Sequence, residues 1–385
     1  MTTAHDQAWG ASMDLALAAA RSGLGHTAPN PSVGVVIVDD HGRVLGTGTS
    51  EEAGGAHAEV VALRRAKAAG HDVRGATMVV TLEPCCHHGR TPPCTDAIIA
   101  GGIARVVAGV ADPFEAVRGR GFQTLRDAGV EVVVGVREAA CTRQILGFAR
   151  AQLQGLPEVS AKAAVSLDGH IATAAGDSAW ITGEEARTHG RRLRLTHDAI
   201  LVGRGTALAD DPRLTARSDD LGPDWDPVPV VFDSKLQLPA DLRMFRGPRR
   251  AIVVTTEEAP ERALPADVLR VPSGPDGRVD PVAALRAMVA RGLHRVLVEG
   301  GGELHGSLFS AGLVDTLYLY VAGVLVPGGR PWLAGEAVEP LARAARLQLD
   351  DVEQVGEDLC TVWRATHRLG PLVPDDLLSG STGEG

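Results

Sequence analysis

The stretch that decides the fold of the first half of the chain is Met78–Cys94, which reads MVVTLEPCCHHGRTPPC. Its first five residues form an apolar, β-branched run, which predicts a buried strand. That strand leads directly into Cys85, and a second cysteine, Cys94, follows at the start of a predicted helix over 92–101. A buried strand that ends on a cysteine presents a thiol at the edge of a sheet, which makes metal binding or catalysis the first hypothesis.

An imidazole and a carboxylate precede this stretch at the start of another predicted helix, 57–69. The order His57-x-Glu59 and then Pro84-Cys85 is typical of zinc deaminases. Three protein ligands and a water make an open, catalytic zinc site, and a carboxylate beside it can carry a proton to a departing amine. Glu59 suits that role.

The second cysteine of the usual P-C-x-x-C spacing is absent, because residue 88 is His. Cys94, after a longer loop, is the candidate for the second thiolate. Two alternatives remain at this point: a closed structural zinc site built from Cys85, His88, Cys94 and a fourth group, or buried thiols without a metal.

The combination of H-A-E with P-C-x₃-G-x-T-P-P-C resembles the deaminase domain of the bacterial bifunctional riboflavin-biosynthesis deaminase/reductase family. The resemblance implies a cytidine-deaminase-like, three-layer α/β/α domain with one zinc ion on His57, Cys85 and Cys94 and with Glu59 as the proton carrier. The segment P-N-P-S-V-G at 29–34 is also similar, which implies that Asn30 lies near the pyrimidine. His87 and His88 receive no role.

The rest of the chain alternates between helical and strand patterns, which predicts an α/β protein. In the first half we expect helices at 12–22 and 121–128, and strands at 33–38, 43–49, 106–110 and 130–134. Periodicity breaks near Ala149–Pro157, so we expect one domain over 1–152 and a second over 153–368. The segment 369–385 is rich in Gly, Ser, Asp and Pro and predicts a disordered tail.

The second half lacks a strand-linked G-x-G-x-x-G, which argues against an ordinary dinucleotide-binding fold. A predicted strand at 295–299 instead runs into Gly300-Gly301-Gly302 and a helix, an arrangement that suits phosphate at a helix N-terminus. Taken alone, this loop also fits a tight turn. An arginine cluster lies upstream and offers a grip for a substrate phosphate; its members are Arg187, Arg191, Arg192, Arg194, Arg204, Arg213 and Arg217.

Five short segments in this half resemble the reductase domain of the same family: VSLDG at 165–169, SAWIT at 178–182, GTALADDP at 205–212, DS at 233–234 and VEGG at 298–301. The resemblance implies a dihydrofolate-reductase-like α/β domain that uses NADPH. The implied cofactor contacts are Ala164, Trp180, Thr206, Asp210, Ser234, Gly300, Gly301, Gly302, Glu303, Leu304, His305 and Gly306. The implied substrate contacts are Ser178, Arg194, Leu214, Arg217 and Glu299, with Lys162 a further candidate. Packing is the alternative for Trp180, and turn capping is the alternative for Asp210.

Charge and length limit the remaining possibilities. The 385 residues carry a net charge of −10, which gives no global field for nucleic acid. We see no secretory signal and no apolar run long enough to span a bilayer, and we expect a cytoplasmic protein. The five cysteines are an odd number, and three of them lie close together, which argues against a disulfide framework.

These features together predict a fused enzyme for two successive steps of riboflavin biosynthesis. The resemblance implies deamination of 2,5-diamino-6-ribosylamino-4(3H)-pyrimidinone 5′-phosphate to 5-amino-6-(5-phosphoribosylamino)uracil, and then reduction of the ribosyl to the ribityl side chain by NADPH. The expected partner is a phosphorylated pyrimidine, with no nucleic acid and no membrane, in a homo-oligomer (dimer or tetramer). The alternative is a nucleoside or tRNA deaminase fused to an unrelated domain.

Overall fold

The computed structural model describes residues 4–87, 92–216, 225–335, 337, 339–366, 369 and 372–374. The chain forms two compact units. The first contains Met1–Gln154 with Leu369–Gly385, and the second contains Gly155–Arg368. Two residues discussed above, His88 and Arg217, lie outside the described residues.

A five-stranded sheet with the order β2-β1-β3-β4-β5 organises the first unit. Its strands are β1 (Gly34–Val38), β2 (Val44–Thr49), β3 (Thr77–Leu82), β4 (Arg105–Val110) and β5 (Glu131–Val134). Strands β3, β4 and β5 are parallel, whereas β1 is antiparallel to both of its neighbours. Every residue of β1 and β3 is buried, as expected for strands covered on both faces.

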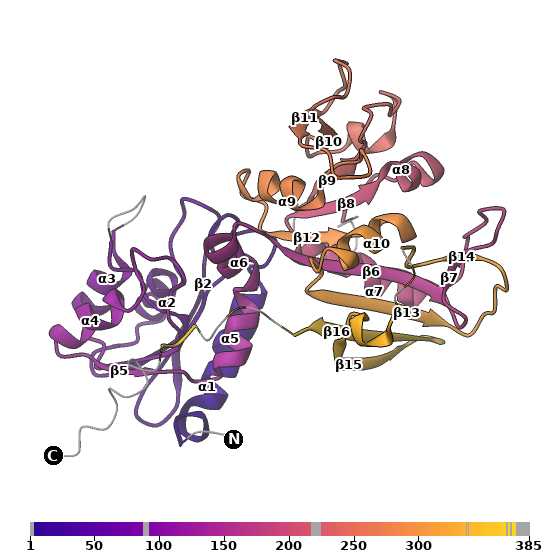
Figure 1. Cartoon of the computed structure of the whole chain (residues 1–385). Helices are drawn as coiled ribbons and strands as arrows, with labels where there is room; N and C mark the ends of the chain where they lie inside the picture. The colour runs from indigo at the N-terminus through magenta and orange to yellow at the C-terminus, as the bar shows by residue number, and fades with distance from the viewer. Residues whose placement is uncertain are drawn as a thin grey trace. The chain divides into compact units, whose positions relative to one another are not determined.

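Helices cover both faces of this sheet and complete the predicted three-layer α/β/α domain (Figure 1). The helices are α1 (Ala4–Arg21), α2 (Ala58–Ala68), α3 (Cys94–Ala100), α4 (Arg120–Asp127), α5 (Glu138–Gln144) and α6 (Leu146–Gln154). Helix α2 lies so close to β2 that a Cβ atom at Gly48 would collide with the carbonyl oxygen of Ala58. A glycine at this position therefore allows the N-terminus of α2 to approach the sheet.

Part of the expected disordered tail belongs to the core of the first unit. Leu372 and Val373 are 2% and 1% exposed and lie in the main apolar cluster of that unit, and Leu369 packs against it. The prediction of disorder is wrong for these residues. It was based on the average composition of the segment 369–385, which is rich in Gly, Ser, Asp and Pro, and it overlooked the short apolar stretch at the start of that segment.

The second unit is built on a nine-stranded sheet with the order β11-β10-β9-β8-β12-β6-β13-β16-β15 (Figure 1). The seven strands from β11 to β13 are parallel, and β16 and β15 add an antiparallel edge. The bounds are β6 (Glu158–Ser166), β8 (Ala199–Gly203), β9 (Val228–Phe232), β10 (Ile252–Thr256), β11 (Asp267–Val271), β12 (Arg295–Val298), β13 (Thr316–Ala322), β15 (Leu347–Val355) and β16 (Asp358–Ala365). A short pair, β7 (His170–Ala172) and β14 (Arg330–Pro331), lies apart from this sheet.

Both faces of the large sheet are buried, as strand β8 illustrates. Leu201 belongs to one apolar cluster and its neighbour Ile200 to another, because successive side chains of a strand point to opposite faces. Helices α9 (Pro281–Val289) and α10 (Gly302–Ser310) contribute to the first cluster, and α8 (Arg204–Asp210) contributes to the second. Helix α7 (Glu184–Arg192) packs with β13 and β16. The α/β fold class is as predicted. Four helices (α5, α6, α8 and α9) and six strands (β7, β11, β13, β14, β15 and β16) were not predicted.

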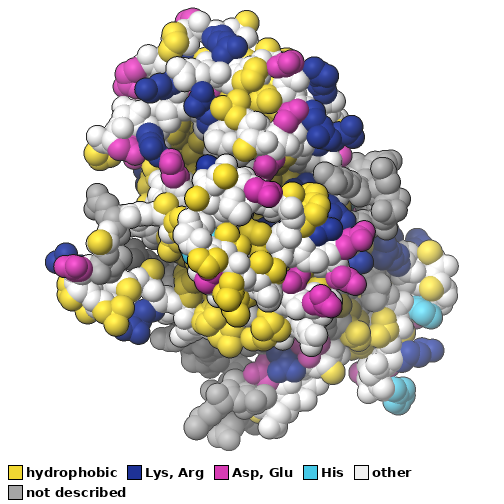
Figure 2. All heavy atoms as spheres, turned by 90° about the vertical axis from the view of Figure 1, so that its right-hand side faces the viewer, with side chains coloured by type: hydrophobic (Ala, Val, Ile, Leu, Met, Phe, Trp, Pro, Cys, Tyr) yellow, Lys and Arg dark blue, Asp and Glu magenta, His cyan; other side chains and the backbone are white. Residues whose placement is uncertain are grey.

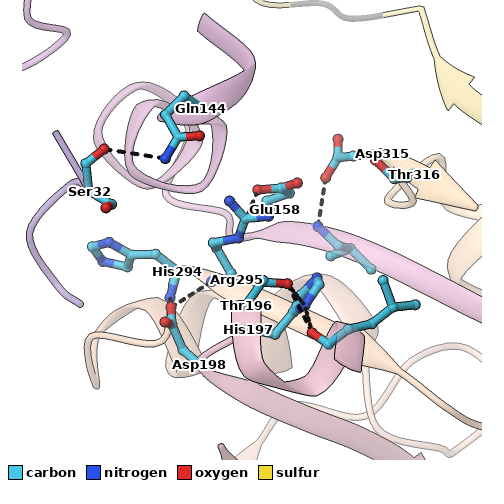
Figure 3. A network of polar contacts seen from close by, with 12 residues as sticks. Ser32, Gln144, Glu158, Thr196, His197, Asp198, His294, Arg295, Asp315 and Thr316 are labelled. Atoms are coloured by element: carbon cyan, nitrogen blue, oxygen red, sulfur yellow. Dashed lines mark hydrogen bonds and ion pairs between the residues drawn. The ribbon is translucent and has the colours of Figure 1, made fainter. Parts of the chain in front are cut away.

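Carboxylates tie neighbouring strands together at the N-terminal ends of the parallel strands (Figure 3). Asp198 Oδ2 accepts hydrogen bonds from the backbone N–H groups of His294 and Arg295, each at 2.8 Å. Asp315 Oδ2 accepts another from Val159 at 2.7 Å. These bonds fix the register of the sheet at the end opposite to the one at which the strands run into the loops of the cavity described below.

Among the described residues, no helix is long and apolar enough to cross a membrane. On the face shown in Figure 2, basic side chains lie among acidic ones and do not form a continuous basic surface.

Candidate active sites

The first candidate site lies where β3, α2 and α3 meet. His57 immediately precedes α2, and Glu59 lies in its first turn. Cys85 follows the end of β3, and Cys94 is the first residue of α3. The fold therefore brings together the imidazole, the carboxylate and the two thiols that the sequence singled out.

The three proposed ligand atoms form a cluster in which each lies within 4.8 Å of the others. His57 Nδ1 is 3.2 Å from Cys94 Sγ and 3.5 Å from Cys85 Sγ. Ligand bonds of about 2.1 Å to nitrogen and 2.3 Å to sulfur in a tetrahedron require N···S separations of about 3.5 Å, so this donor set fits zinc. Within the part of the chain that the structure describes, this cluster has three members, as an open catalytic site requires.

Burial, hydrogen bonds and neighbouring charges shift the pKa values of Cys85 and Glu59 in directions that suit metal binding and proton transfer. A hydrogen bond from Cys94, and another from His57, lower the pKa of Cys85, which favours the thiolate. Glu59 is only 4% exposed, and burial, together with the negative charge of Cys85, raises its pKa to about 7. A pKa near neutrality suits Glu59 to exchange protons with a water, and a bound dication would lower that pKa.

A buried carboxylate beside the metal ligands, Glu83, was not predicted from the sequence. Its two oxygens accept hydrogen bonds from four backbone N–H groups, those of Asp112, Gly119, Gly121 and Phe122, at 2.9–3.3 Å. Burial raises the pKa of Glu83, and the four donors oppose that rise by stabilising the anion. Glu83 thus fastens the loop that carries Cys85 to the segment 112–122.

Asp112 is a second unpredicted acid at this site. It follows β4, the parallel neighbour of β3, so Asp112 and Cys85 lie at the same edge of the sheet. Asp112 is 8% exposed, and burial raises its pKa to about 7, with smaller contributions from the negative charges of Glu83, Cys85 and Glu59. The signal that could have found it is an acid directly after a second buried strand of the predicted sheet.

Three further residues of the first unit are more exposed to solvent than the metal-binding cluster is. Asn30 is exposed in the loop before β1, where its backbone N–H donates to Thr27, and its pyrimidine contact stays a prediction. Cys86 is partly buried and is not in the metal cluster. His87 is exposed, and its ring centroid lies 5.8 Å from that of Phe114.

The second candidate site is a cavity of about 1660 Å³ at the carboxyl ends of the parallel strands of the second unit. This volume suits a dinucleotide together with a phosphorylated substrate. As predicted, strand β12 runs through Glu299 and a glycine loop into α10, with Gly301 at the N-cap.

Most residues predicted to contact the cofactor or substrate line this cavity. They are Ala164, Ser178, Trp180, Arg194, Thr206, Asp210, Leu214, Ser234, Glu299, Gly300, Gly301, Gly302, Glu303 and Leu304, together with Lys162. His305 and Gly306 are buried away from the lining: His305 Nδ1 lies 3.2 Å from the carbonyl oxygen of Trp332, and Gly306 packs against Ala334. The helical period of 3.6 residues explains this, since His305 and Gly306 of α10 face the core and the next residue, Ser307, lines the cavity again. Their predicted cofactor contacts stay predictions.

The structure excludes core packing for Trp180, and the predicted cofactor contacts of Trp180 and Asp210 stay predictions. Trp180 is 74% exposed, so it is not a core residue, and the guanidinium of Arg187 lies 4.6 Å from its ring centroid. Asp210 lines the cavity, whereas the side chain of its neighbour Asp211 accepts a hydrogen bond from the backbone N–H of Arg243, 32 residues further along the chain.

A charged cluster lies on one wall of the cavity. Arg194 Nε and Nη2 donate to the two oxygens of Glu299 at 2.7 and 2.8 Å, and Nη1 donates to the carbonyl oxygen of Thr215. Burial opposes the charge on Glu299, but Arg194 and Lys162 overcome this effect and lower its pKa to about 2. Arg194 therefore holds Glu299 as a carboxylate, these contacts use part of its guanidinium, and its predicted substrate contact stays a prediction. Among the other predicted arginines, Arg187 and Arg204 also line the cavity.

Each half of the chain matches a known protein family. Residues 8–110 match the family described as "Cytidine and deoxycytidylate deaminase zinc-binding region", and residues 157–361 match "RibD C-terminal domain". Curated relatives called "Riboflavin biosynthesis protein RibD" include those of Mycobacterium tuberculosis, at 41% identity, and Escherichia coli, at 39%. Each alignment covers 90% of this chain, and 94% and 97% of the respective relative.

Solved structures of RibD proteins are similar to this chain along nearly its whole length. A diaminohydroxyphosphoribosylaminopyrimidine deaminase/5-amino-6-(5-phosphoribosylamino)uracil reductase from Thermotoga maritima is 34% identical, with a TM-score of 0.84. A RibD structure from Acinetobacter baumannii is also 34% identical, with a TM-score of 0.81, and both comparisons cover 94% of this chain and 99% of the other. The chain therefore belongs to the RibD family of bifunctional riboflavin biosynthesis enzymes, with a deaminase domain followed by a reductase domain.

Proposed function

We propose that the first unit hydrolyses the exocyclic amine of 2,5-diamino-6-ribosylamino-4(3H)-pyrimidinone 5′-phosphate, and that the second unit reduces the ribosyl side chain of the product with NADPH. The observation that carries the first half is the cluster of His57, Cys85 and Cys94 beside the buried Glu59. The observation that carries the second is the large cavity lined by the glycine loop and the Arg194–Glu299 pair.

In the deaminase site, His57, Cys85 and Cys94 would hold one zinc ion. The bound ion would supply a water acidified toward neutral pH. Glu59 takes a proton from the attacking water and passes it to the departing nitrogen, so that a C–O bond forms, the C–N bond breaks and ammonia leaves. Glu83 and the segment it binds keep Cys85 in place during these steps.

In the reductase site, the backbone N–H groups of the loop Gly300–Gly302 bind the pyrophosphate of NADPH at the N-terminus of α10. NADPH, when bound, supplies the hydride that reduces the sugar carbon. Arg194 contributes its remaining N–H groups to the substrate phosphate, while Glu299 and Lys162 line the wall against which the sugar is placed. Trp180 also lines this cavity, with its side chain largely exposed.

A single coupled assay tests both halves. The full chain receives the diamino-pyrimidinone phosphate with and without NADPH, and ammonia and NADPH are measured separately. We expect ammonia in both mixtures, and NADPH oxidation that follows it. Release of no ammonia by zinc-loaded protein would contradict the deaminase assignment, and ammonia release without any NADPH oxidation would contradict the reductase assignment.

A further inference from the structure

A tight turn after strand β9 presents two polar side chains to the reductase cavity. The turn is held by the buried Asp233, whose Oδ2 accepts hydrogen bonds from the backbone N–H groups of Gln237 at 2.5 Å and Leu238 at 2.7 Å. Within it, Leu236 has a φ of +53°, a left-handed conformation that a non-glycine residue adopts at some cost. The turn therefore fixes Ser234 and Lys235, both of which line the cavity.

Lys235 forms no ion pair with a carboxylate within the described part of the chain, in contrast to two arginines of the same cavity. Arg194 is paired with Glu299, and Arg278 Nη1 lies 2.8 Å from Glu303. Lys235 is exposed. Such a free ammonium group at a cavity wall suits an anionic ligand.

Two neighbouring groups suit the same kind of ligand. Ser234 Oγ accepts a hydrogen bond from the backbone N–H of Val279 at 3.0 Å, so its own hydroxyl proton remains available to a bound group. Arg204 also lines the cavity, and its Nε lies 3.8 Å from Asp233 Oδ1. A hydroxyl, an ammonium and a guanidinium at one place form a donor set for a phosphate monoester.

The order of strands places this donor set at a defined distance from the reaction centre. Lys162 on β6 and Glu299 after β12 mark the substrate end, and the glycine loop also follows β12. Strand β9 is separated from β6 by β12 and β8, which amounts to about 14 Å at roughly 4.8 Å per strand. An extended dinucleotide with its nicotinamide at the substrate and its pyrophosphate on the glycine loop directs its adenosine toward β9.

We propose that Lys235, with Ser234 and Arg204, binds the 2′-phosphate of the adenosine ribose and thereby selects NADPH over NADH. The inference rests on the proposed use of this cavity for a nicotinamide dinucleotide. It assigns the selectivity to a phosphate that takes no part in hydride transfer.

Binding measurements on the full chain test the proposal without relying on turnover. NADPH and NADH are titrated by nicotinamide fluorescence into the unaltered chain and into K235M, K235R and K67M, and 2′,5′-ADP and 5′-ADP are titrated by calorimetry. Losing a charged donor to phosphate weakens binding by about 10- to 100-fold. We expect K235M to bind NADPH and 2′,5′-ADP about 10- to 100-fold more weakly than the unaltered chain does. Its affinities for NADH and 5′-ADP should change by less than about twofold. K235R retains most of the affinity, and K67M, on the exposed face of α2 in the other unit, retains all of it.

The lysine content of the chain provides an independent readout. The chain has three lysines, Lys67, Lys162 and Lys235, of which Lys67 and Lys235 are exposed. Acetylation followed by mass spectrometry should show that saturating NADPH protects Lys235 and leaves Lys67 reactive, and that saturating NADH protects Lys235 much less.

Two outcomes would overturn the inference. Equal weakening of NADPH and NADH by K235M, or no weakening of either, contradicts the role of Lys235 alone. Absence of NADPH binding to the unaltered chain contradicts the proposed reductase function, and the inference fails with it.

Discussion

The two candidate sites differ in how many parts of the chain build them. The deaminase site depends on four side chains within 57–94, which lie on two helix starts and one strand end and gather around one point. The reductase cavity takes its lining from segments that extend from Lys162 to Ala334, and its volume is about 1660 Å³. A metal site therefore needs a few side chains at fixed distances, whereas a dinucleotide site distributes recognition over many contacts. A single substitution of a metal ligand should therefore abolish most of the activity of the deaminase site. A single substitution in the reductase cavity should reduce ligand affinity only in part.

The largest expected effect is the loss of metal from C85S. Removing one of three ligands should lower zinc affinity by more than about 100-fold, because a serine hydroxyl does not replace a thiolate on zinc. C86S is a matched control, since Cys86 is the adjacent residue and lies outside the cluster. Metal analysis after dialysis should find about one zinc per chain in C86S and little in C85S. Equal zinc content in the two variants would contradict the assigned ligand set.

The next largest effect concerns the Arg194–Glu299 pair in the second site. R194A leaves a buried carboxylate without its partner, which should destabilise the second unit by about 3 kcal/mol. Adding E299Q to R194A should recover part of that loss, because the uncompensated charge is then removed. Denaturation followed by fluorescence of Trp332 and Trp363, which pack on the core of this unit, measures both variants. A double variant as unstable as R194A would show that the loss arises from packing instead.

A smaller effect should follow when the hydrogen bonds of Glu83, which hold the loop that carries Cys85, are weakened. E83Q replaces one carboxylate oxygen with a donor, so that two of the four backbone N–H groups lose their acceptor. We expect an approximately 10- to 100-fold lower kcat for deamination with zinc still bound, and about 2 kcal/mol less stability in the first unit. NADPH oxidation with the deaminated pyrimidine should not change. If KM rises and kcat does not, Glu83 does not act by positioning the Cys85 loop.

The smallest effect is a pH dependence that belongs to the second unit alone. Burial lowers the pKa of His197 to about 3, and its Nδ1 donates to the carbonyl oxygen of Leu193 at 2.7 Å (Figure 3). Below pH 6.5 the unfolded chain binds a proton that the folded chain excludes, so the contribution of His197 to stability is complete above pH 6.5 and falls as the pH is lowered. Between pH 7 and pH 5 the fall is about 2 kcal/mol.

The neighbouring Asp198 acts with the opposite sign, because burial raises its pKa to about 6. The comparison with H197N, which retains an N–H donor, isolates the histidine. The unaltered chain should be the more stable at pH 7, and its advantage over H197N should shrink by about 2 kcal/mol at pH 5. A stability difference that does not vary with pH would contradict this account.

The contrast between the two sites also explains what sequence reasoning could predict. His57, Glu59, Cys85 and Cys94 lie on predicted element starts and ends, so local pattern was sufficient to group them. Glu83 and Asp112 were missed because their roles depend on which strands are neighbours in the sheet. The tail was misjudged for a similar reason, since the burial of Leu372 and Val373 depends on a core formed by residues far away in the sequence.

In the second unit, the glycine loop was predictable because a strand, three glycines and a helix follow one another directly. The engagement of Arg194 by Glu299 was not, since 105 residues separate the two. The same limit applies to Lys235, whose significance depends on the strand order and on its forming no ion pair among the described residues. Helix phase likewise determined that His305 and Gly306 do not reach the cavity.

The measurement that tests the central claim most directly is a paired assay of E59Q. The chain carries a deaminase site and a separate reductase site, and we expect Glu59 to serve only the deaminase site. E59Q should keep about one zinc per chain, release ammonia from the diamino substrate at least about 100-fold more slowly, and oxidise NADPH with the deaminated pyrimidine at the unaltered rate. Ammonia release at the unaltered rate, or loss of both activities in a folded protein that retains zinc, would contradict this expectation.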